Sequence, residues 1–518
     1  MKLRHKLTAL SLAIAVAVGA HAADLTIAYD ADPVSLDPME QLSGATLQLA
    51  HLIFDPLVRT NSKLEFVPRL AESWEQVSPT VTRFKLRQGV KFHSGNPMTA
   101  DDVVWSFNRY KSSGDFKAVF EPYSELKKID DYTVDLVAKK PYPLVMANAT
   151  YLFVMDSKFY TGQSEDGKDK SKIEKNTGSY ASTHESGTGV FKVKSRQQGV
   201  KLELTKFKDY WGKTGNVDNL TWVPIKENAT RLAALLSGDV DMIAPVAPTD
   251  LDRVRDNPNT ELLTMPSDRI ITIQLNQKVV PEFKNVKVRQ AVAYAINNAG
   301  IVKKIMRGFG TAAGQNSPEG YAGHNPDLTP RYDLDKAKAL MKEAGYEKGF
   351  TVTMISPNNR YVNDEKIAQA IAAMLKKINI TVNLTTMPKA QYWPEYDKKE
   401  NGIQFIGWSS DTGDSANYSE FLTMTPDEKT GRGQYNAGFY ANPELDKLIN
   451  QANAELDPAK RSALLKQVSK IEYDDAAFIP LHWQNLAWGY NKKITNLKDN
   501  VNLKNFPLFG DIVVEEKK

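Results

Sequence analysis

The sequence of 518 residues contains no cysteine. No disulfide can therefore hold the fold together, and no thiol is available for chemistry. The lipid-bearing cysteine that tethers some exported bacterial proteins to a membrane is missing as well. Stability must come from packed cores, and a chain of this length is expected to form two or three of them.

A strong excess of charge is also lacking. The chain has 66 Lys and Arg against 62 Asp and Glu, a formal net charge of +4. Lys2, Arg4 and Lys6 supply much of that excess, so residues 23–518 carry only about +1, with both signs interspersed. This balance does not indicate binding to nucleic acid or to an anionic membrane surface.

Long apolar runs are absent after the first residues. Residues 7–19 form an uncharged stretch behind the positive start, and Ala20 and Ala22 place small residues where a signal peptidase reads. The stretch is too short to span a bilayer, which takes about 20 apolar residues. We interpret residues 1–22 as a secretory signal peptide cleaved after Ala22, with a membrane anchor as the alternative. The mature chain is expected to be exported, without direct membrane insertion.

Catalytic motifs are missing too. The histidines that follow residue 22 show no ligand spacing on one helix face; they are His51, His93, His184, His324 and His482. No serine lies in a G-x-S-x-G motif, and Gly308-Phe309-Gly310 lacks the rest of a phosphate-binding loop. The sequence predicts no enzyme, no cofactor and no metal site, although a triad scattered along the chain stays open.

Helical and strand patterns alternate along the chain. Residues 25–29 alternate like a half-buried strand, and Asp333 is placed to cap a helix over 335–344. The strongest amphipathic pattern, residues 367–378, is followed directly by a strand pattern over 380–384. This order favours an α/β architecture.

Two loops stand out because each follows a predicted strand. Residues 407–414 follow the apolar run 403–406 and carry Trp408 and Asp411, and residues 356–361 follow the strand 352–355 and carry Arg360. Loops at strand ends are where α/β folds bind ligands. A fixed anion and a fixed cation suit a zwitterionic ligand. An ordinary salt bridge between loops is the alternative.

Short motifs along almost the whole chain after residue 22 carry a resemblance. They are Ser35-Leu36-Asp37-Pro38, residues 70–74, 84–92, 99–107 and 187–191, Tyr210-Trp211-Gly212, residues 286–291, Ala295-Ile296-Asn297 and Asp335-Lys336-Ala337. With these motifs in this order, the chain resembles the extracellular solute-binding proteins of peptide and nickel ABC importers (family 5). Within that family it is most similar to the dipeptide-binding proteins.

The resemblance implies an α/β fold with two lobes, the type II, cluster C fold of periplasmic binding proteins, with an additional domain on the first lobe. The limits it implies are residues 23–55, 186–274 and 483–518 for a discontinuous first lobe, 56–185 for the additional domain and 275–482 for the second lobe.

The resemblance also implies roles for single residues. The position of Asp411 matches the aspartate that holds a dipeptide's ammonium group, and Arg360 matches the arginine that holds the carboxylate. Trp408 matches a tryptophan lining the side-chain pocket, and Ser43 and Gly44 match a segment that contacts the peptide backbone. The dipeptide binders carry disulfides that this chain lacks, which affects stability rather than the site.

The function implied is that of a monomeric periplasmic receptor, not a lipoprotein, that delivers a short peptide to an ABC permease. Other cargoes stay open: an oligopeptide, glutathione, haem, a metal chelate or an oligosaccharide. A secreted peptide hydrolase is the alternative from another class, and a chaperone-like role is a third.

Overall fold

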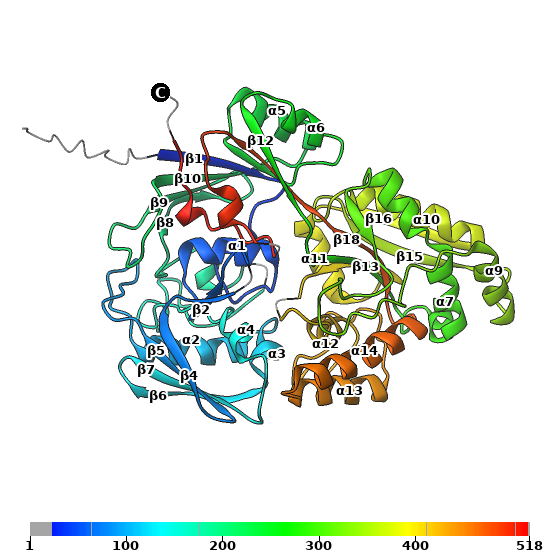
Figure 1. The fold of residues 1–518 in the computed structure, drawn as a ribbon, viewed down its shortest axis with the longest axis horizontal. Helices are drawn as coiled ribbons and strands as arrows, with labels where there is room; N and C mark the ends of the chain where they lie inside the picture. The colour runs from blue at the N-terminus through cyan, green and yellow to red at the C-terminus, as the bar shows by residue number, and fades with distance from the viewer. Residues whose placement is uncertain (1–22, 64, 176, 411, 503, 516–518) are drawn as a thin grey trace, which may run out of the picture.

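The computed structural model describes residues 23–63, 65–175, 177–410, 412–502 and 504–515. The predicted signal peptide and its cleavage site lie outside these residues. In Figure 1 two bodies stand side by side, one with β1 and α1, the other with β13 to β18. No helix in the described ranges is both long enough and apolar enough to cross a bilayer.

The first body contains a seven-stranded sheet in the order β12-β19-β11-β1-β10-β9-β8. Its strands are β1 (Ala23–Tyr29), β8 (Phe191–Gln197), β9 (Lys201–Lys206), β10 (Val217–Pro224), β11 (Met242–Ala244), β12 (Thr260–Met265) and β19 (Leu486–Asn491). β1 lies in the middle and is parallel to both β10 and β11. Leu25, Ile27 and Ala28 are therefore all buried, as in a strand covered on both faces.

The second body contains a six-stranded sheet in the order β14-β18-β13-β17-β15-β16. Its strands are β13 (Ile270–Leu275), β14 (Gly310–Ala312), β15 (Phe350–Pro357), β16 (Ile380–Met387), β17 (Ile403–Trp408) and β18 (Ile479–Gln484). β15 runs parallel to β16 and β17, and β13 is antiparallel to β17 and β18. The carboxyl ends of β15 and β17 therefore lie at one edge of this sheet, as expected for strands followed by the loops of Arg360 and Asp411.

A smaller four-stranded antiparallel sheet, in the order β4-β5-β7-β6, lies beside the first body. Its strands are β4 (Ala71–Ser78), β5 (Val81–Leu86), β6 (Tyr123–Asp130) and β7 (Thr133–Ala138), and the short strands β2 (Val58–Thr60) and β3 (Phe66–Pro68) pair nearby. Arg109 of α2 (Ala100–Ser112) donates two hydrogen bonds, of 2.9 and 2.6 Å, to the carboxylate of Asp37. Both side chains are buried, so this pair fixes the N-terminal segment to the smaller unit.

Helices cover the sheets and complete the described chain. The remaining ones are α1 (Gly44–Ile53), α3 (Lys117–Phe120), α4 (Val145–Ala149), α5 (Asn228–Ser237), α6 (Leu251–Arg255), α7 (Val286–Ala295), α8 (Asn298–Gly300), α9 (Leu334–Glu343), α10 (Asp364–Leu375), α11 (Lys389–Lys398), α12 (Ala416–Leu422), α13 (Pro443–Ala454) and α14 (Pro458–Asp474). The predicted cap is confirmed, because Asp333 accepts a hydrogen bond of 2.9 Å from the Lys336 N–H. The amphipathic pattern over 367–378 ends as an α-helix at Leu375 and continues as a single 3₁₀ turn.

The chain crosses between the two large sheets twice. Residues 266–269 connect β12 to β13, and Asn485 connects β18 to β19. The crossings lie side by side, since the Gln484 N–H donates a hydrogen bond of 2.9 Å to the Arg269 carbonyl. The exact limits expected for the lobes and the additional domain stay a prediction.

A buried carboxyl in the second body gives a pH-dependent stability. Burial raises the pKa of Glu472 to about 7, although the Thr423 hydroxyl (2.6 Å) and the Asn316 amide (2.9 Å) donate to it. An acid with a raised folded-state pKa costs stability as pH rises from its unfolded pKa, about 4.5, to about 7. We expect Glu472→Gln to be stabilising relative to wild type at pH 8, by up to ~3 kcal/mol, with little difference at pH 4. Thermal unfolding across this range measures the effect, and a difference independent of pH would contradict it.

Candidate functional site

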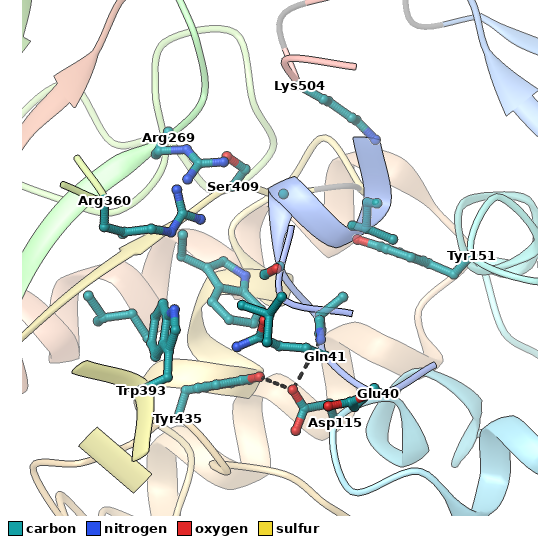
Figure 2. Close-up of a pocket in the computed structure, with 18 of the residues that line it drawn as sticks. Glu40, Gln41, Asp115, Tyr151, Arg269, Arg360, Trp393, Ser409, Tyr435 and Lys504 are labelled. Carbon is teal, nitrogen blue, oxygen red and sulfur yellow. Dashed lines mark hydrogen bonds between the residues drawn. The ribbon is translucent and has the colours of Figure 1, made fainter. Parts of the chain in front are cut away.

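A cavity lies between the two bodies and is lined by segments from both. Its empty space is about 960 Å³ including the part open to solvent. Ser43, Gly44 and Asp115 come from one side, and Arg360 and Trp408 come from the other. Figure 2 shows Arg269 and Arg360 at one end of this cavity and Glu40 and Asp115 at the other. The two ends therefore differ in charge.

The structure brings four of the five predicted site residues to this cavity. Ser43, Gly44, Arg360 and Trp408 all line it, although they come from three distant parts of the chain. The fifth, Asp411, lies outside the described residues. The ligand roles of all five stay predictions, which are taken up below.

The backbone of the loop that carries Arg360 is held firmly between β15 and α10. The N–H groups of Arg360 and Tyr361 donate hydrogen bonds of 2.9 and 3.0 Å to the buried carboxylate of Asp364. The Val362 N–H donates to the Gln484 side chain at 3.1 Å, next to the second crossing. These three bonds fix the backbone at residues 360–362, so the Arg360 side chain starts from a well-held backbone.

The guanidinium of Arg360 has no ion-pair partner within the described chain. It lies 5.0 Å from the centre of the Tyr361 ring, and its Nε is buried without a hydrogen-bond acceptor. A buried guanidinium retains strong donors that need an acceptor. The side chain therefore has hydrogen-bond donors at the cavity wall without an acceptor in the described chain.

Arg269 is a cavity residue that the sequence did not reveal. It ends the first crossing, is 9% exposed and lines the cavity beside Arg360. Burial, and then the positive charge of Arg360, lower the pKa of Arg269 to about 10. A side chain added at Gly44 would place its Cβ 3.0 Å from a guanidinium nitrogen of Arg269, so glycine leaves this group its space. No motif marks Arg269, because its position depends on the crossing and not on a strand-end loop.

A second compartment adjoins the first through shared walls. Gly44, Arg269 and Arg360 line both, and Asp30, Trp222 and Lys389 are among the residues that line the second alone. Its empty space is about 730 Å³ including the open part. Lys389 is 4% exposed, and burial followed by the charge of Arg360 lowers its pKa to about 8. The sequence did not indicate Lys389 either.

Trp408 forms an aromatic wall of the first compartment. It is the last residue of β17, so the expectation that it lies in the following loop was wrong: the strand runs two residues beyond 406. The strand extends this far because Trp408 still pairs with Ile270 of β13. Its ring lies 4.8 Å from Phe421 and 5.0 Å from Tyr435, and its Nε1 donates to Asn417 at 2.8 Å. The indole is thus fixed as an apolar surface.

Ser43 and Gly44 belong to the start of α1, which faces both compartments. The Ser43 hydroxyl accepts a weak bond of 3.4 Å from the Thr46 N–H as the helix cap. The partial positive charge of a helix N-terminus favours anions nearby. It adds to the positive character that Arg269 and Arg360 give to this end.

At the opposite end, contacts join the two bodies. Lys175 lies 2.9 Å from Asp115 and 3.3 Å from Asp397 of α11. The Tyr435 hydroxyl donates to Asp115 at 2.7 Å, a bond drawn in Figure 2. Arg432 lies 3.5 Å from Glu121. The structure therefore has the two bodies in contact around the cavity.

The described part of the cavity combines charged and aromatic groups. Within the described ranges no three His, Cys, Asp or Glu gather as metal ligands. What the cavity offers is one cationic end, an aromatic wall and a mouth between two bodies.

Comparison with known proteins agrees with this geometry. The model of the bacterial extracellular solute-binding proteins, family 5 Middle, matches residues 65–429. The dipeptide-binding protein of Escherichia coli (strain K12) is 29% identical over 493 residues, which cover 90% of each chain. The glutathione-binding protein GsiB of Shigella flexneri is 27% identical over 510 residues, 95% of this chain and 96% of that one.

Among solved structures, the periplasmic binding protein DppA of Helicobacter pylori, in complex with the peptide STSA, aligns with a TM-score of 0.85. The two chains are 26% identical, and the alignment covers 95% of this chain and 98% of DppA. The expected fold class, a type II periplasmic-binding-protein fold, is confirmed.

The contact that Lys175 makes between Asp115 and Asp397 gives a prediction about closure. Replacing Lys175 by Met leaves two carboxylates facing each other, which favours separation of the bodies by hinge motion. Because Lys175 is 48% exposed, we expect only about a fivefold shift toward the open form. Small-angle X-ray scattering should give a larger radius of gyration than wild type.

The matched control is Lys168→Met, since Lys168 is exposed and pairs only with Asp166, at 3.6 Å, among the described residues. Scattering curves that are identical for Lys175→Met and Lys168→Met would exclude a role for Lys175 in closure.

Proposed function

The chain belongs to the family 5 bacterial extracellular solute-binding proteins, and we propose that it is the periplasmic receptor of an ABC importer for short peptides, with dipeptides favoured. It acts as a monomer, captures the peptide in the interlobe cavity and delivers it to the permease. The protein breaks no bond of the peptide, so the peptide is delivered unchanged. The relatives named for dipeptide, glutathione and peptide support this choice of cargo.

The observation that carries the proposal is the unpaired guanidinium of Arg360 in the interlobe cavity. A peptide carboxylate fits it, because a guanidinium can donate two parallel hydrogen bonds to a carboxylate. The hydrogen-bonded loop that carries Arg360 fixes the base of this side chain, and with it the place where a carboxylate would bind. A terminal carboxylate at a fixed point makes the receptor sensitive to peptide length.

The remaining contacts follow from the cavity wall. The ammonium group of the peptide would meet Asp411, the backbone would lie near Ser43 and Gly44, and a side chain would pack on Trp408. The indole Nε1 already donates its hydrogen bond to Asn417, so the ring offers the ligand an apolar surface. Side-chain identity would therefore be read loosely, by size and apolar character.

Closure of the lobes strengthens these contacts. Exclusion of water lowers the effective dielectric around each charge-assisted hydrogen bond. Each ion loses its hydration at the same time, so it needs its partner in the closed state. The closed form would then be the one that the permease recognises.

A screen of ligands separates this function from the alternatives. Thermal shift with di-, tri- and oligopeptides, beside haem, nickel and oligosaccharides, should raise the melting temperature most for short peptides. A response only to another class would replace the peptide by that cargo. Intact dipeptide after prolonged incubation, measured by mass spectrometry, would exclude a hydrolase.

Arg360→Met should abolish most dipeptide binding. The peptide carboxylate would be buried without its cation, at a cost of roughly 3–5 kcal/mol. Calorimetry with Ala-Ala measures this loss. Arg253→Met is the matched control, because Arg253 is exposed on α6, and it should leave the affinity unchanged. Equal affinities for both variants would remove Arg360 from the site.

Asp411→Ala should cost roughly 3–5 kcal/mol of dipeptide binding by leaving the ammonium unpaired in the closed cavity. N-acetyl-Ala-Ala, which has no ammonium group, is the matched ligand. Wild type should prefer Ala-Ala strongly, and the variant should bind both ligands alike. A variant that still prefers Ala-Ala would show that another group holds the ammonium.

A further inference from the structure

Three cations surround the boundary between the two compartments: Arg269 and Lys389, which are buried, and Arg360, which is partly buried. We call them the cation cluster. Arg269 is 9% and Lys389 4% exposed, and the Nε of Arg360 is buried. In the part of the chain that the structure describes, none of the three side chains has an ion pair or a hydrogen bond to an acceptor. Cations held together in this way repel one another and have lost hydration.

Three anions lie near the cation cluster, Asp30, Asp32 and Asp268, and none of them forms an ion pair with it among the described residues. Burial raises the pKa of the Asp30 carboxyl. Among the nearby cations, Arg231 lowers this pKa the most, followed by Lys389 and Arg360. Asp32 lies 3.3 Å from Arg196. Asp30 and Asp32 are therefore shared with cations outside the cluster.

The carboxylates at the far end of the first compartment are also engaged. Asp115 contacts Lys175 and accepts hydrogen bonds from the Tyr435 hydroxyl and the Leu42 N–H. Glu40 accepts from the Ser35 hydroxyl at 2.6 Å and from the Thr177 N–H at 2.7 Å. Neither is placed to serve the cation cluster.

A simple dipeptide would leave the cluster incompletely paired. Under the proposed function its ammonium group takes the charge of Asp411, and its single carboxylate takes Arg360. Arg269 and Lys389 would then be buried by closure near Asp30, Asp32 and Asp268, none of which forms an ion pair with them among the described residues. The N-terminus of α1, which starts at Gly44 between the compartments, adds further positive character there.

Building on the proposed function, we propose that the preferred cargo is an acidic short peptide or peptide-like molecule with a second carboxylate. Its first carboxylate binds Arg360 from the first compartment. The second passes the shared wall at Gly44 and binds Arg269 and Lys389 in the second compartment. The roughly 730 Å³ of that compartment gives the additional group room.

The test compares isosteric peptides that differ only in one charge. Calorimetry at pH 7 with wild-type protein uses Ala-Glu against Ala-Gln, and Glu-Ala against Gln-Ala. At least one acidic peptide should bind about 10- to 100-fold more tightly than its amide partner, as expected for hydrogen bonds to a buried charged group. Equal affinity within both pairs would overturn the second-carboxylate site while leaving the peptide receptor intact. If none of the four peptides binds, the proposed function itself fails.

Variants then assign the preference to residues. Arg269→Met and Lys389→Met should each lower the ratio of acidic to amide affinity toward one. Lys377→Met, exposed in the turn after α10, is the matched control and should keep the wild-type ratio. The melting temperature of each ligand-free variant checks its folding. This temperature should not fall, because the substitution removes a buried charge that has no partner. A ratio unchanged in both cluster variants would overturn the assignment.

Discussion

The burial of like charges between two lobes is the constraint on which the site depends. Arg269 and Arg360 belong to segments about ninety residues apart, and both line the two compartments. Arg269 precedes β13, and the Arg360 loop follows β15. Both strands pair with β17, so the sheet brings the two arginines together. The sheet thus enforces a proximity that the charges oppose. Such an arrangement is stable only if solvent or a ligand compensates it.

Hydrogen bonds and close contacts hold the scaffold around these charges in place. The Gly407 N–H donates to the Tyr361 hydroxyl at 2.7 Å, and a Cβ at Gly407 would come within 2.6 Å of the Tyr361 ring. Close contacts of this kind lock the Arg360 loop against β17. Because the loop cannot move away, repulsion between Arg269 and Arg360 is relieved by an incoming anion and not by rearrangement.

The sequence predicted those parts of the site that depend on local order. Arg360 and Trp408 follow strand patterns, and strand ends gather at one edge of a parallel arrangement, so their convergence could be expected. Arg269 and Lys389 could not be found this way. Arg269 gains its place from the crossing between two sheets. Lys389 is the first residue of α11, where its N–H donates a hydrogen bond to the side-chain oxygen of Asn359. Lysine and arginine are frequent on surfaces, so only tertiary burial distinguishes these two.

The two ends of the cavity explain why a ligand, and a charged one, would control closure. At one end Lys175 pairs with carboxylates from both bodies. At the other end closure brings α1 and its Gly44 against Arg269, with no anion of the described chain paired to that guanidinium. The first end favours closing and the second opposes it. A ligand shifts this balance only by the difference in its affinity for the two forms. An anion that binds the cation cluster has a higher affinity for the closed form, because it offsets the repulsion between the cations that closure buries.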